Sequence, residues 1–356
     1  MNKVLRVDWG LALAVISLMA MGLVTLAANP AGELFYRQLA WIVLALALIF
    51  GLPFINLRAI FNYRWLVVGI YLSALFLLIL TYFFASPISG ARSWLTVGSV
   101  QIQASEFMKA ALIILLSSFF ALRHVSIAQP RVILISFVYF LVPVILVLLQ
   151  PDLGTSLVLF GIWFGYLLVS ELPRRYILVA LIALIVIGAL SWSFALAPYQ
   201  KERIAGLFSP EADPLGVNYS VLQSKIAIGS AGLLGKGFGQ GTQVQLGFLP
   251  AAHTDFIFSA FMEEWGLLGG FLLIAAFLYL IYRILQLGMK SYNNFAKFVA
   301  LGVAITLFIH FAVNLGSALG LLPVIGISLP FVSYGGSNLL TMAALIGINS
   351  GVHERR

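Results

Sequence analysis

Long apolar runs separated by short polar segments extend along this chain from beginning to end. A helix needs about 20 mostly apolar residues to span the hydrocarbon core of a bilayer. The pattern therefore predicts an all-α polytopic membrane protein with about ten transmembrane helices. We place these spans at residues 9–28, 39–55, 65–84, 106–122, 132–149, 153–169, 176–195, 256–282, 298–321 and 339–352.

One polar segment is much longer than the others and lies between the seventh and eighth spans, at residues 198–255. Connections of this length usually have a function of their own. Tyr219, Leu222 and Ile226 recur at helical spacing and predict a short surface helix inside it. No shift in composition divides the chain, so we expect a single integral membrane domain over residues 1–356 that includes this large loop.

Composition supports the membrane assignment and excludes several kinds of chemistry. Charged residues make up 9% of the chain and the mean hydropathy is +1.06, whereas soluble domains carry about 25% charged residues. The absence of Cys excludes disulfides and thiolate catalysis. The four His residues include no pair with the spacing of a helical zinc site. The net charge of +8 fits loops that face an anionic membrane leaflet, so no nucleic acid partner is expected.

Lys and Arg residues predict the orientation, because cytoplasmic loops are enriched in them. With the N-terminus inside, 13 of the 20 lie in cytoplasmic segments and six lie outside, four of those in the long loop. Both termini are therefore predicted to be cytoplasmic. In this orientation the polar clusters all fall on the outer side, where buried polar residues are costly and tend to be functional. The clusters contain Ser105, Glu106 and Lys109; Asp152; Gln223 and Lys225; His253, Thr254 and Asp255; and Ser333 and Ser337.

Asp255 is the most informative of these residues. It places one of only 12 acidic side chains at the mouth of a long apolar helix, directly after the large loop. One interpretation is a charge that complements the helix dipole, and the other is a catalytic base. Glu263 lies about 80° from Asp255 around the helix and could share a cavity with it, whereas Glu264 lies about 180° away and is expected to pair with a neighbouring helix.

The other charged candidates also have two interpretations. Glu106 and Lys109 are three residues apart on one helix, so they could form a local ion pair. Asp152 follows a proline and could be an N-cap for the sixth span. In both cases the alternative is a contact with substrate.

Six segments, at residues 90–94, 103–109, 150–155, 223–230, 248–258 and 330–337, occur in an order that resembles the SEDS family (shape, elongation, division and sporulation proteins), which polymerises bacterial peptidoglycan. The loop signature and short termini are more similar to the elongation branch, RodA, than to the division branch, FtsW. The chain departs from the family at Ala104, where Pro is common, and at Ala251, where Glu is frequent. Ala251 argues against an essential acid at its position.

The resemblance implies a peptidoglycan glycosyltransferase that takes lipid II and joins the GlcNAc 4-hydroxyl of one glycan to the MurNAc C1 of another, in cell elongation and rod-shape maintenance. It implies Asp255 as the base and cations around the pyrophosphate. A divalent cation, Mg²⁺ or Mn²⁺, could assist, although the sequence shows no dedicated cage, and no organic cofactor is expected. The residues expected to bind or orient pyrophosphate and glycan are Glu106, Lys109, Asp152, Arg203, Gln223, Lys225, His253, Thr254, Ser333 and Ser337.

The resemblance also implies a bacterial cytoplasmic membrane location and a class B penicillin-binding protein as partner. We expect the partner's transmembrane helix on the eighth and ninth spans, where Gly302, Ala304 and Ala312 could permit close approach. Two alternatives remain: a flippase for lipid II, and a non-catalytic scaffold for the penicillin-binding protein. A flippase needs cationic groups on both faces and through the middle, whereas the polar clusters here lie on one side.

Overall fold

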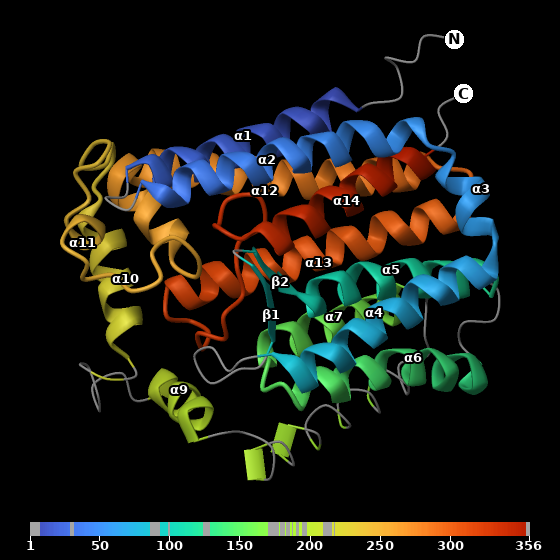
Figure 1. Ribbon diagram of the computed structural model, residues 1–356. Helices are drawn as coiled ribbons and strands as arrows, with labels where there is room; N and C mark the ends of the chain where they lie inside the picture. The colour runs from blue at the N-terminus through green and yellow to red at the C-terminus, as the bar shows by residue number, and fades with distance from the viewer. Residues whose placement is uncertain are drawn as a thin grey trace. The chain divides into compact units, whose positions relative to one another are not determined.

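Figure 1 shows the computed structural model, which describes residues 8–28, 32–85, 93–98, 100–123, 129–169, 198–208 and 218–353, with a few isolated positions elsewhere. The described chain is almost entirely helical, as the hydrophobic pattern predicts. In chain order the elements are α1 (Trp9–Ala27), α2 (Glu33–Gly51), η2 (Leu52–Phe54), α3 (Leu57–Asn62), α4 (Arg64–Phe84), β1 (Trp94–Val97), β2 (Val100–Gln103), α5 (Ala104–Ala121), α6 (Pro130–Leu148), α7 (Leu153–Val169), α9 (Pro198–Phe208), α10 (Tyr219–Ser230), α11 (Thr242–Gln245), α12 (Ile257–Lys290), α13 (Asn294–Ala318) and α14 (Gly336–Val352).

Seven described helices are long and apolar enough to cross a membrane: α1, α2 with η2, α4, α5, α6, α12 and α13. Helices α7 and α14, of 17 residues each, cover the sixth and tenth predicted spans. The seventh predicted span, 176–195, lies largely outside the described residues. The chain is thus a multi-pass membrane protein.

Helix α12 continues eight residues beyond its predicted end at residue 282. The predicted span stops at residue 282, before Arg283, because a charged residue indicates a membrane boundary. In the structure Arg283 Nη2 lies 2.9 Å from Asp8 Oδ2. Asp8 is itself buried and caps α1 by accepting a 3.0 Å hydrogen bond from Leu11 N. A paired charge can be accommodated inside a helix, which explains the difference.

A short hairpin between α4 and α5 was not predicted. Strands β1 and β2 pair antiparallel, with Trp94 opposite Gln103 and Val97 opposite Val100. Gly98 has a φ of 62° at the turn, a conformation that glycine adopts readily. Strands of four residues are too short to stand out from apolar runs of about 20 residues, so the hydrophobic pattern did not predict them. The hairpin leads directly into the N-terminus of α5.

The described helices belong to two compact units, each made of segments far apart in sequence. Unit 1 contains Met1–Leu52, Glu202–Arg283 and Leu307–Gly347, and unit 2 contains Pro53–Lys201, Ile284–Thr306 and Ile348–Arg356. The prediction of a single domain remains a prediction. Asp255 and residues 202–255 of the large loop belong to unit 1, whereas Glu106, Lys109 and Asp152 belong to unit 2.

Helix α5 forms the centre of unit 2, where it packs against α4, α6 and α7. On α7, the Tyr166 hydroxyl donates to Phe298 O at 2.8 Å and lies 2.9 Å from Ser117 Oγ. A Cβ at Gly302 would meet this hydroxyl at 2.2 Å, and Ala304 is also buried. Gly302 and Ala304 are therefore buried and offer no free surface to a partner helix, so the expectation is wrong for these two residues, whereas Ala312 is half-buried.

In unit 1, helices α1 and α2 pack on each other and on the segment around the start of α14. A Cβ at Gly22 would lie 2.2 Å from Val332 O, so glycine is needed for α1 to come this close. Gln38 of α2 donates to Ser333 O at 3.3 Å and accepts from Gly335 N at 3.4 Å. These contacts hold the polypeptide that precedes α14.

Helix α12 is broken at Gly266, which has φ 69° and ψ −170°. Residues 232–241, here called the glycine loop, supply the missing hydrogen bonds. Their backbone amides donate to Glu263 O and Glu264 O at 3.0 Å, and their carbonyls accept from the amides of residues 267 and 268 at 3.0 and 3.2 Å. In a membrane protein a broken helix is tolerated where other protein groups satisfy its freed backbone, and the glycine loop does so here.

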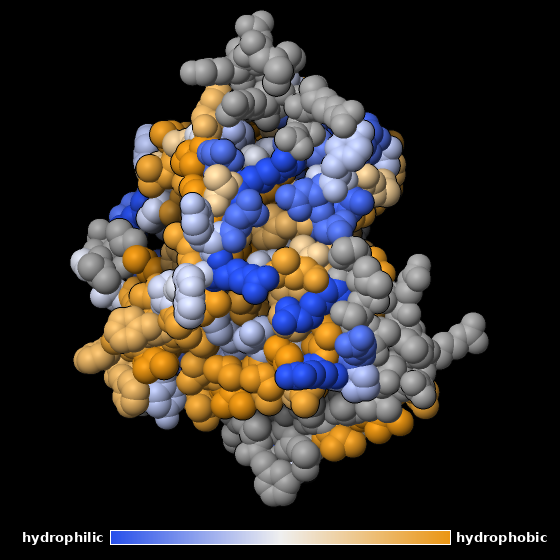
Figure 2. All heavy atoms as spheres, turned by 90° about the vertical axis from the view of Figure 1, so that its right-hand side faces the viewer, coloured by the Kyte–Doolittle hydropathy of each residue, from blue (hydrophilic) through white to orange (hydrophobic). Residues whose placement is uncertain are grey.

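Figure 2 faces the end of the helices that carries α3, where hydrophilic residues gather across the middle and apolar residues lie around them. Arg58 of α3 donates through Nε to Val352 O at 3.0 Å, and Arg64 at the start of α4 is exposed. A polar end with apolar flanks is expected where helices leave a membrane.

Candidate active site

The His253-Thr254-Asp255 turn lies immediately before α12. It is closed by hydrogen bonds from Thr254 N and Phe256 N to Ala251 O, at 3.0 and 3.2 Å. Ala251 has a φ of 51°, in the left-handed region that few residues other than glycine adopt. Backbone strain of this kind persists where the surrounding structure over-determines it. The turn places Asp255 at the N-terminal end of the apolar helix, as predicted.

The carbonyls of these three residues are each held by a donor from the last part of the chain. His253 O accepts from Tyr334 N at 2.8 Å, Thr254 O accepts from Ser333 Oγ at 2.7 Å, and Asp255 O accepts from Asn314 Nδ2 at 2.9 Å. The backbone on either side of Asp255 is therefore fixed from outside its own helix.

The electrostatics of the turn suit a base. Burial raises the pKa of the Asp255 carboxyl, while the Arg203 guanidinium and a hydrogen bond from Thr254 act in the opposite direction. Burial lowers the pKa of His253, so its neutral form is favoured. A carboxylate with a raised pKa accepts a proton more readily near neutral pH, and the nearby cation keeps it available in its charged form.

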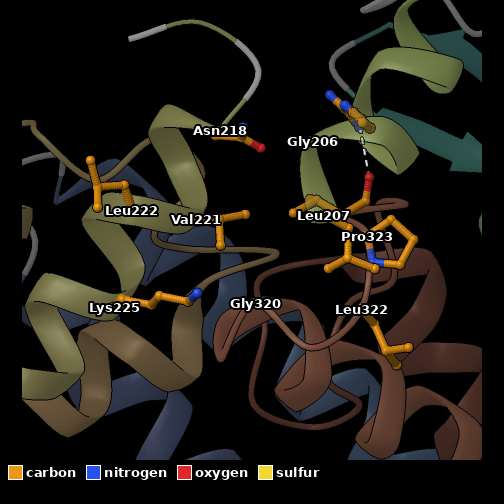
Figure 3. A pocket seen from close by; sticks show the side chains of 11 residues that line it. Gly206, Leu207, Asn218, Val221, Leu222, Lys225, Gly320, Leu322 and Pro323 are labelled. Carbon is orange, nitrogen blue, oxygen red and sulfur yellow. Dashed lines mark hydrogen bonds between the residues drawn. The ribbon is translucent and has the colours of Figure 1, made fainter. Parts of the chain in front are cut away.

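Arg203 and Lys225 line a small pocket in unit 1 (Figure 3). Arg203 Nη1 donates to Val324 O at 3.0 Å, and the Lys225 side chain extends against Gly320. Both cations are exposed, so both are available to an anionic group. The cavity measures about 70 Å³, room for on the order of five water molecules. Two cations on one pocket suit an anionic group such as a phosphate.

A buried pair of hydroxyl groups connects α10, which carries Lys225, to the start of α12. Ser224 precedes Lys225 on α10, and its Oγ lies 2.7 Å from Ser259 Oγ on the first turns of α12. Ser224 Oγ also lies 2.6 Å from Ala318 O. Neither serine is exposed. Because Ser259 lies one helical turn after Asp255, this pair ties the helix carrying Lys225 to the helix that begins beside Asp255.

In unit 2, Lys109 lies in a buried ion pair. Its Nζ is 2.8 Å from both carboxylate oxygens of Glu106, and Lys109 is 1% exposed. This is the local pair that the three-residue spacing allows. An ammonium group enclosed in this way is held for its partner rather than presented to solvent, so a direct role of Lys109 with pyrophosphate stays a prediction.

Asp152 caps helix α7. Its Oδ1 accepts from Thr155 N at 2.9 Å and its Oδ2 from Thr155 Oγ1 at 2.8 Å. Oδ2 also accepts from Gln103 at 3.1 Å and from Ser105 at 3.4 Å. The geometry is that of an N-cap. The contacts of Asp152 also connect the end of the hairpin and the start of α5 to α7.

The remaining predicted residues differ in their surroundings. Gln223 is half-buried on α10 and is not among the residues that line the pocket. Ser333 is buried, and its hydroxyl both donates to Thr254 O and accepts from Leu329 N at 2.9 Å. Ser337 is buried in the first turn of α14. Ser333 thus stabilises the turn that carries Asp255, and its contact with substrate stays a prediction.

Glu263 and Glu264 do not take the partners expected for them. The Glu263 carboxylate is bound by Lys236 Nζ at 2.6 Å and by Gln243 N at 3.1 Å, which replaces the expected cavity shared with Asp255. Glu264 Oε1 accepts from Gly239 N at 3.2 Å rather than pairing with a neighbouring helix. Both expectations were wrong, because the angular positions of residues around one helix do not predict which distant loop packs against that helix.

Sequence reasoning missed Asn314 and Ser259. Asn314 is a buried polar residue inside an apolar span, and such residues tend to be functional, so that signal was present. Ser259 had no comparable signal, because a single serine is common in transmembrane helices.

Among the described residues, no three His, Asp or Glu side chains come together as metal ligands. The expectation that a divalent cation assists therefore stays a prediction.

Comparisons with known proteins agree on one family. The family model for FtsW, RodA and SpoVE, described as cell cycle protein, matches residues 5–356. The chain is similar to the peptidoglycan glycosyltransferases MrdB of Escherichia coli K12 (40% identical over 81% of this chain and 77% of the relative) and of Helicobacter pylori J99 (40%, over 84% and 77%).

Two solved structures are also similar. One belongs to a study of the structural coordination of polymerization and crosslinking by a peptidoglycan synthase complex, with a TM-score of 0.83 and 36% identity over 98% of this chain and 97% of that one. The other is the rod shape determining protein RodA of Thermus thermophilus, with a TM-score of 0.73 and 32% identity over 98% of this chain and 96% of that one. A structure of an aspartate-to-alanine mutant of the same RodA is also similar.

Proposed function

Because this chain belongs to the FtsW/RodA/SpoVE family of cell cycle proteins, we propose that it joins the disaccharide units of lipid II into glycan strands with Asp255 as its catalytic base. The chain is a peptidoglycan glycosyltransferase of cell elongation, like the MrdB relatives it matches over most of their length. The observation that carries the assignment of the base is the fixed, half-buried turn at the mouth of α12, where burial raises the pKa of the Asp255 carboxyl.

The proposed reaction forms one bond and breaks one. The 4-hydroxyl oxygen of a GlcNAc residue attacks C1 of a MurNAc residue, and the hydroxyl proton passes to the Asp255 carboxylate. The bond between C1 and the phosphate oxygen breaks, and its electron pair leaves with undecaprenyl pyrophosphate. Negative charge develops on that pyrophosphate, so cations held nearby lower the barrier.

Arg203 and Lys225 suit this second role. Both are exposed side chains that line the same pocket, and Arg203 lies near enough to Asp255 to affect the pKa of its carboxyl. A phosphate group bound by Arg203 would therefore contact the same cation that acts on the pKa of the proposed base. The two cations support pyrophosphate as the occupant of this pocket.

The proposed location is the bacterial cytoplasmic membrane, with both termini in the cytoplasm and the large loop outside. The excess of Lys and Arg in the short loops of one side supports this orientation. The proposed partner is a class B penicillin-binding protein that crosslinks the new strands. Its support is the similarity to a solved chain from a peptidoglycan synthase complex.

Purified protein, alone and with its partner, should polymerise lipid II into strands that are visible on a gel, and Asp255→Asn should reduce polymerisation to a small residual rate. Asn keeps the shape of the side chain but cannot accept the proton. Glu33→Gln is the matched control, because Glu33 is an exposed carboxylate that pairs with Arg37 on α2. Folded Asp255→Asn protein that makes normal strands would refute the base. A flippase would instead move labelled lipid II between leaflets and give no polymer.

A further inference from the structure

Asn314, on helix α13, is positioned to control the geometry of the proposed base. Its amide nitrogen donates to Asp255 O at 2.9 Å and to Ile327 O at 2.9 Å. The residue is 1% exposed. A single side chain therefore connects the catalytic turn to the segment between α13 and α14.

The orientation of this amide is determined by its partners. Both contacts of Asn314 are carbonyl oxygens, which only accept hydrogen bonds, so the NH₂ group and not the oxygen must face them. Its Oδ1 is buried and has no hydrogen-bond partner among the described residues. A buried acceptor without a partner is unfavourable. The two N–H donors must therefore outweigh this cost in the folded protein.

The other donors to the turn differ from Asn314 in kind. Tyr334 donates to His253 O through its backbone, and Ser333 donates to Thr254 O one residue before Asp255. Asn314 is the side chain that holds the carbonyl of Asp255 itself. Removing it frees the peptide plane that follows the catalytic Cα, and the carboxylate can then change its position relative to Arg203.

We propose that Asn314 is a positioning residue for Asp255, which holds the carboxylate in the orientation needed to take the proton from the attacking hydroxyl. The inference rests on the proposed role of Asp255 as base. Asn314 does not itself touch the substrate in this account, and it acts through one hydrogen bond to the backbone of Asp255.

The test compares Asn314→Leu, which has a similar volume and no donor, with Asn314→Gln, which keeps the donor. We expect the Leu variant to lower kcat for lipid II polymerisation by about 10- to 100-fold, the size of effect that a small misplacement of a catalytic group produces. KM should stay within about twofold. The acid limb of its pH–rate profile should also shift, because the environment of Asp255 changes. The Gln variant should recover a large part of the rate.

Asn349→Leu is the matched control. Asn349 is another buried asparagine, on α14, whose Nδ2 has no partner among the described residues, and its replacement should leave kcat and the pH profile unchanged. If Asn314→Leu fails to fold, Asn314→Ala replaces it, since Ala is smaller than Leu and also removes both N–H donors. A low kcat in the Ala variant with recovery in the Gln variant supports the proposal.

The Asp255→Asn background separates this inference from the proposed function. If Asn314 acts through Asp255, adding Asn314→Leu to Asp255→Asn should change the residual rate by less than about twofold. An equal loss in both backgrounds, or a normal kcat and pH profile in folded Asn314→Leu, would overturn the positioning role while Asp255 remains the base. An active Asp255→Asn protein would instead overturn the proposed function itself.

Discussion

At the scale of single residues, the base is defined by backbone contacts as much as by its own carboxylate. Ala251 takes a left-handed conformation so that its carbonyl can accept from both Thr254 N and Phe256 N. The absence of an acid at this position, noted from the sequence, now has a local explanation. Residue 251 contributes through its backbone carbonyl, and the functional carboxylate lies four residues later.

Arg203 should set the pH at which the enzyme loses activity. The base must be ionised, so activity should fall as the pH decreases through the pKa of Asp255, which burial raises and Arg203 lowers. Arg203→Gln removes the lowering effect, so the acid limb of the kcat/KM profile should move to higher pH. Polymerisation rates measured across the acid range would show the shift.

Lys201→Gln is the matched control for Arg203→Gln, because it removes a charge from the same helix, α9, whereas the cation that lowers the pKa of Asp255 is Arg203. An acid limb that stays in place in Arg203→Gln, or moves equally in Lys201→Gln, would contradict the specific pairing of Arg203 with Asp255.

At the scale of elements, α12 consists of two helical segments separated by a break at Gly266. The segment before Gly266 begins beside Asp255, and the segment after it continues to Lys290. The glycine loop closes the break by backbone hydrogen bonds, and Lys236 from this loop neutralises the buried Glu263. Uncompensated buried charges are strongly destabilising, so the loop and the helix are required to fold together.

Gly266→Ala should strongly destabilise the protein. A Cβ there would lie 2.3 Å from Gly235 N and 2.4 Å from Leu233 O, on a backbone with positive φ. We expect a loss of at least about 2 kcal/mol in unfolding free energy, seen as a lower midpoint of thermal unfolding in detergent, together with reduced polymerisation.

Gly229→Ala on α10 provides the comparison, because a Cβ at this position meets nothing within 4 Å. Alanine is favoured over glycine within a helix, so this variant should be as stable as the parent or slightly more so. Equal stability of the two variants would mean that the break in α12 does not depend on glycine.

At the scale of the whole molecule, the exposed apolar surface indicates where a partner helix can bind. Helix α12 keeps a stripe of exposed apolar side chains after its break, including Leu267, Phe271 and Leu278. On α13, by contrast, Gly302 and Ala304 are buried. The partner site on the eighth and ninth spans stays a prediction, and within it α12 offers an exposed apolar face that Gly302 and Ala304 of α13 do not.

Single cysteines at Phe271 and Leu278 should crosslink to a cysteine in the transmembrane helix of the penicillin-binding protein in membranes. The chain contains no Cys of its own, so each engineered thiol is unique. Leu72→Cys and Phe76→Cys on α4 are comparably exposed controls and should give little product. Efficient crosslinking from α4 alone would place the partner on the third span.

The sequence by itself determined the class of the protein and most of its helices. About 20 apolar residues in a row can satisfy their backbone in lipid only as a helix, so the local pattern was sufficient for the spans described. The position of Asp255 at the mouth of α12 was equally local. The seventh predicted span lies largely outside the described residues.

Only the tertiary structure decided how the site is held. The donors to the 253–255 carbonyls come from Asn314, Ser333 and Tyr334, and the partner of Glu263 comes from the glycine loop. Helical periodicity indicates which face of one helix is apolar, but it contains no information about which distant segment returns to a given carbonyl or carboxylate. Hydrogen bonds between such segments depend on the packing of the whole chain, because each requires two groups to meet within about 3 Å at a suitable angle.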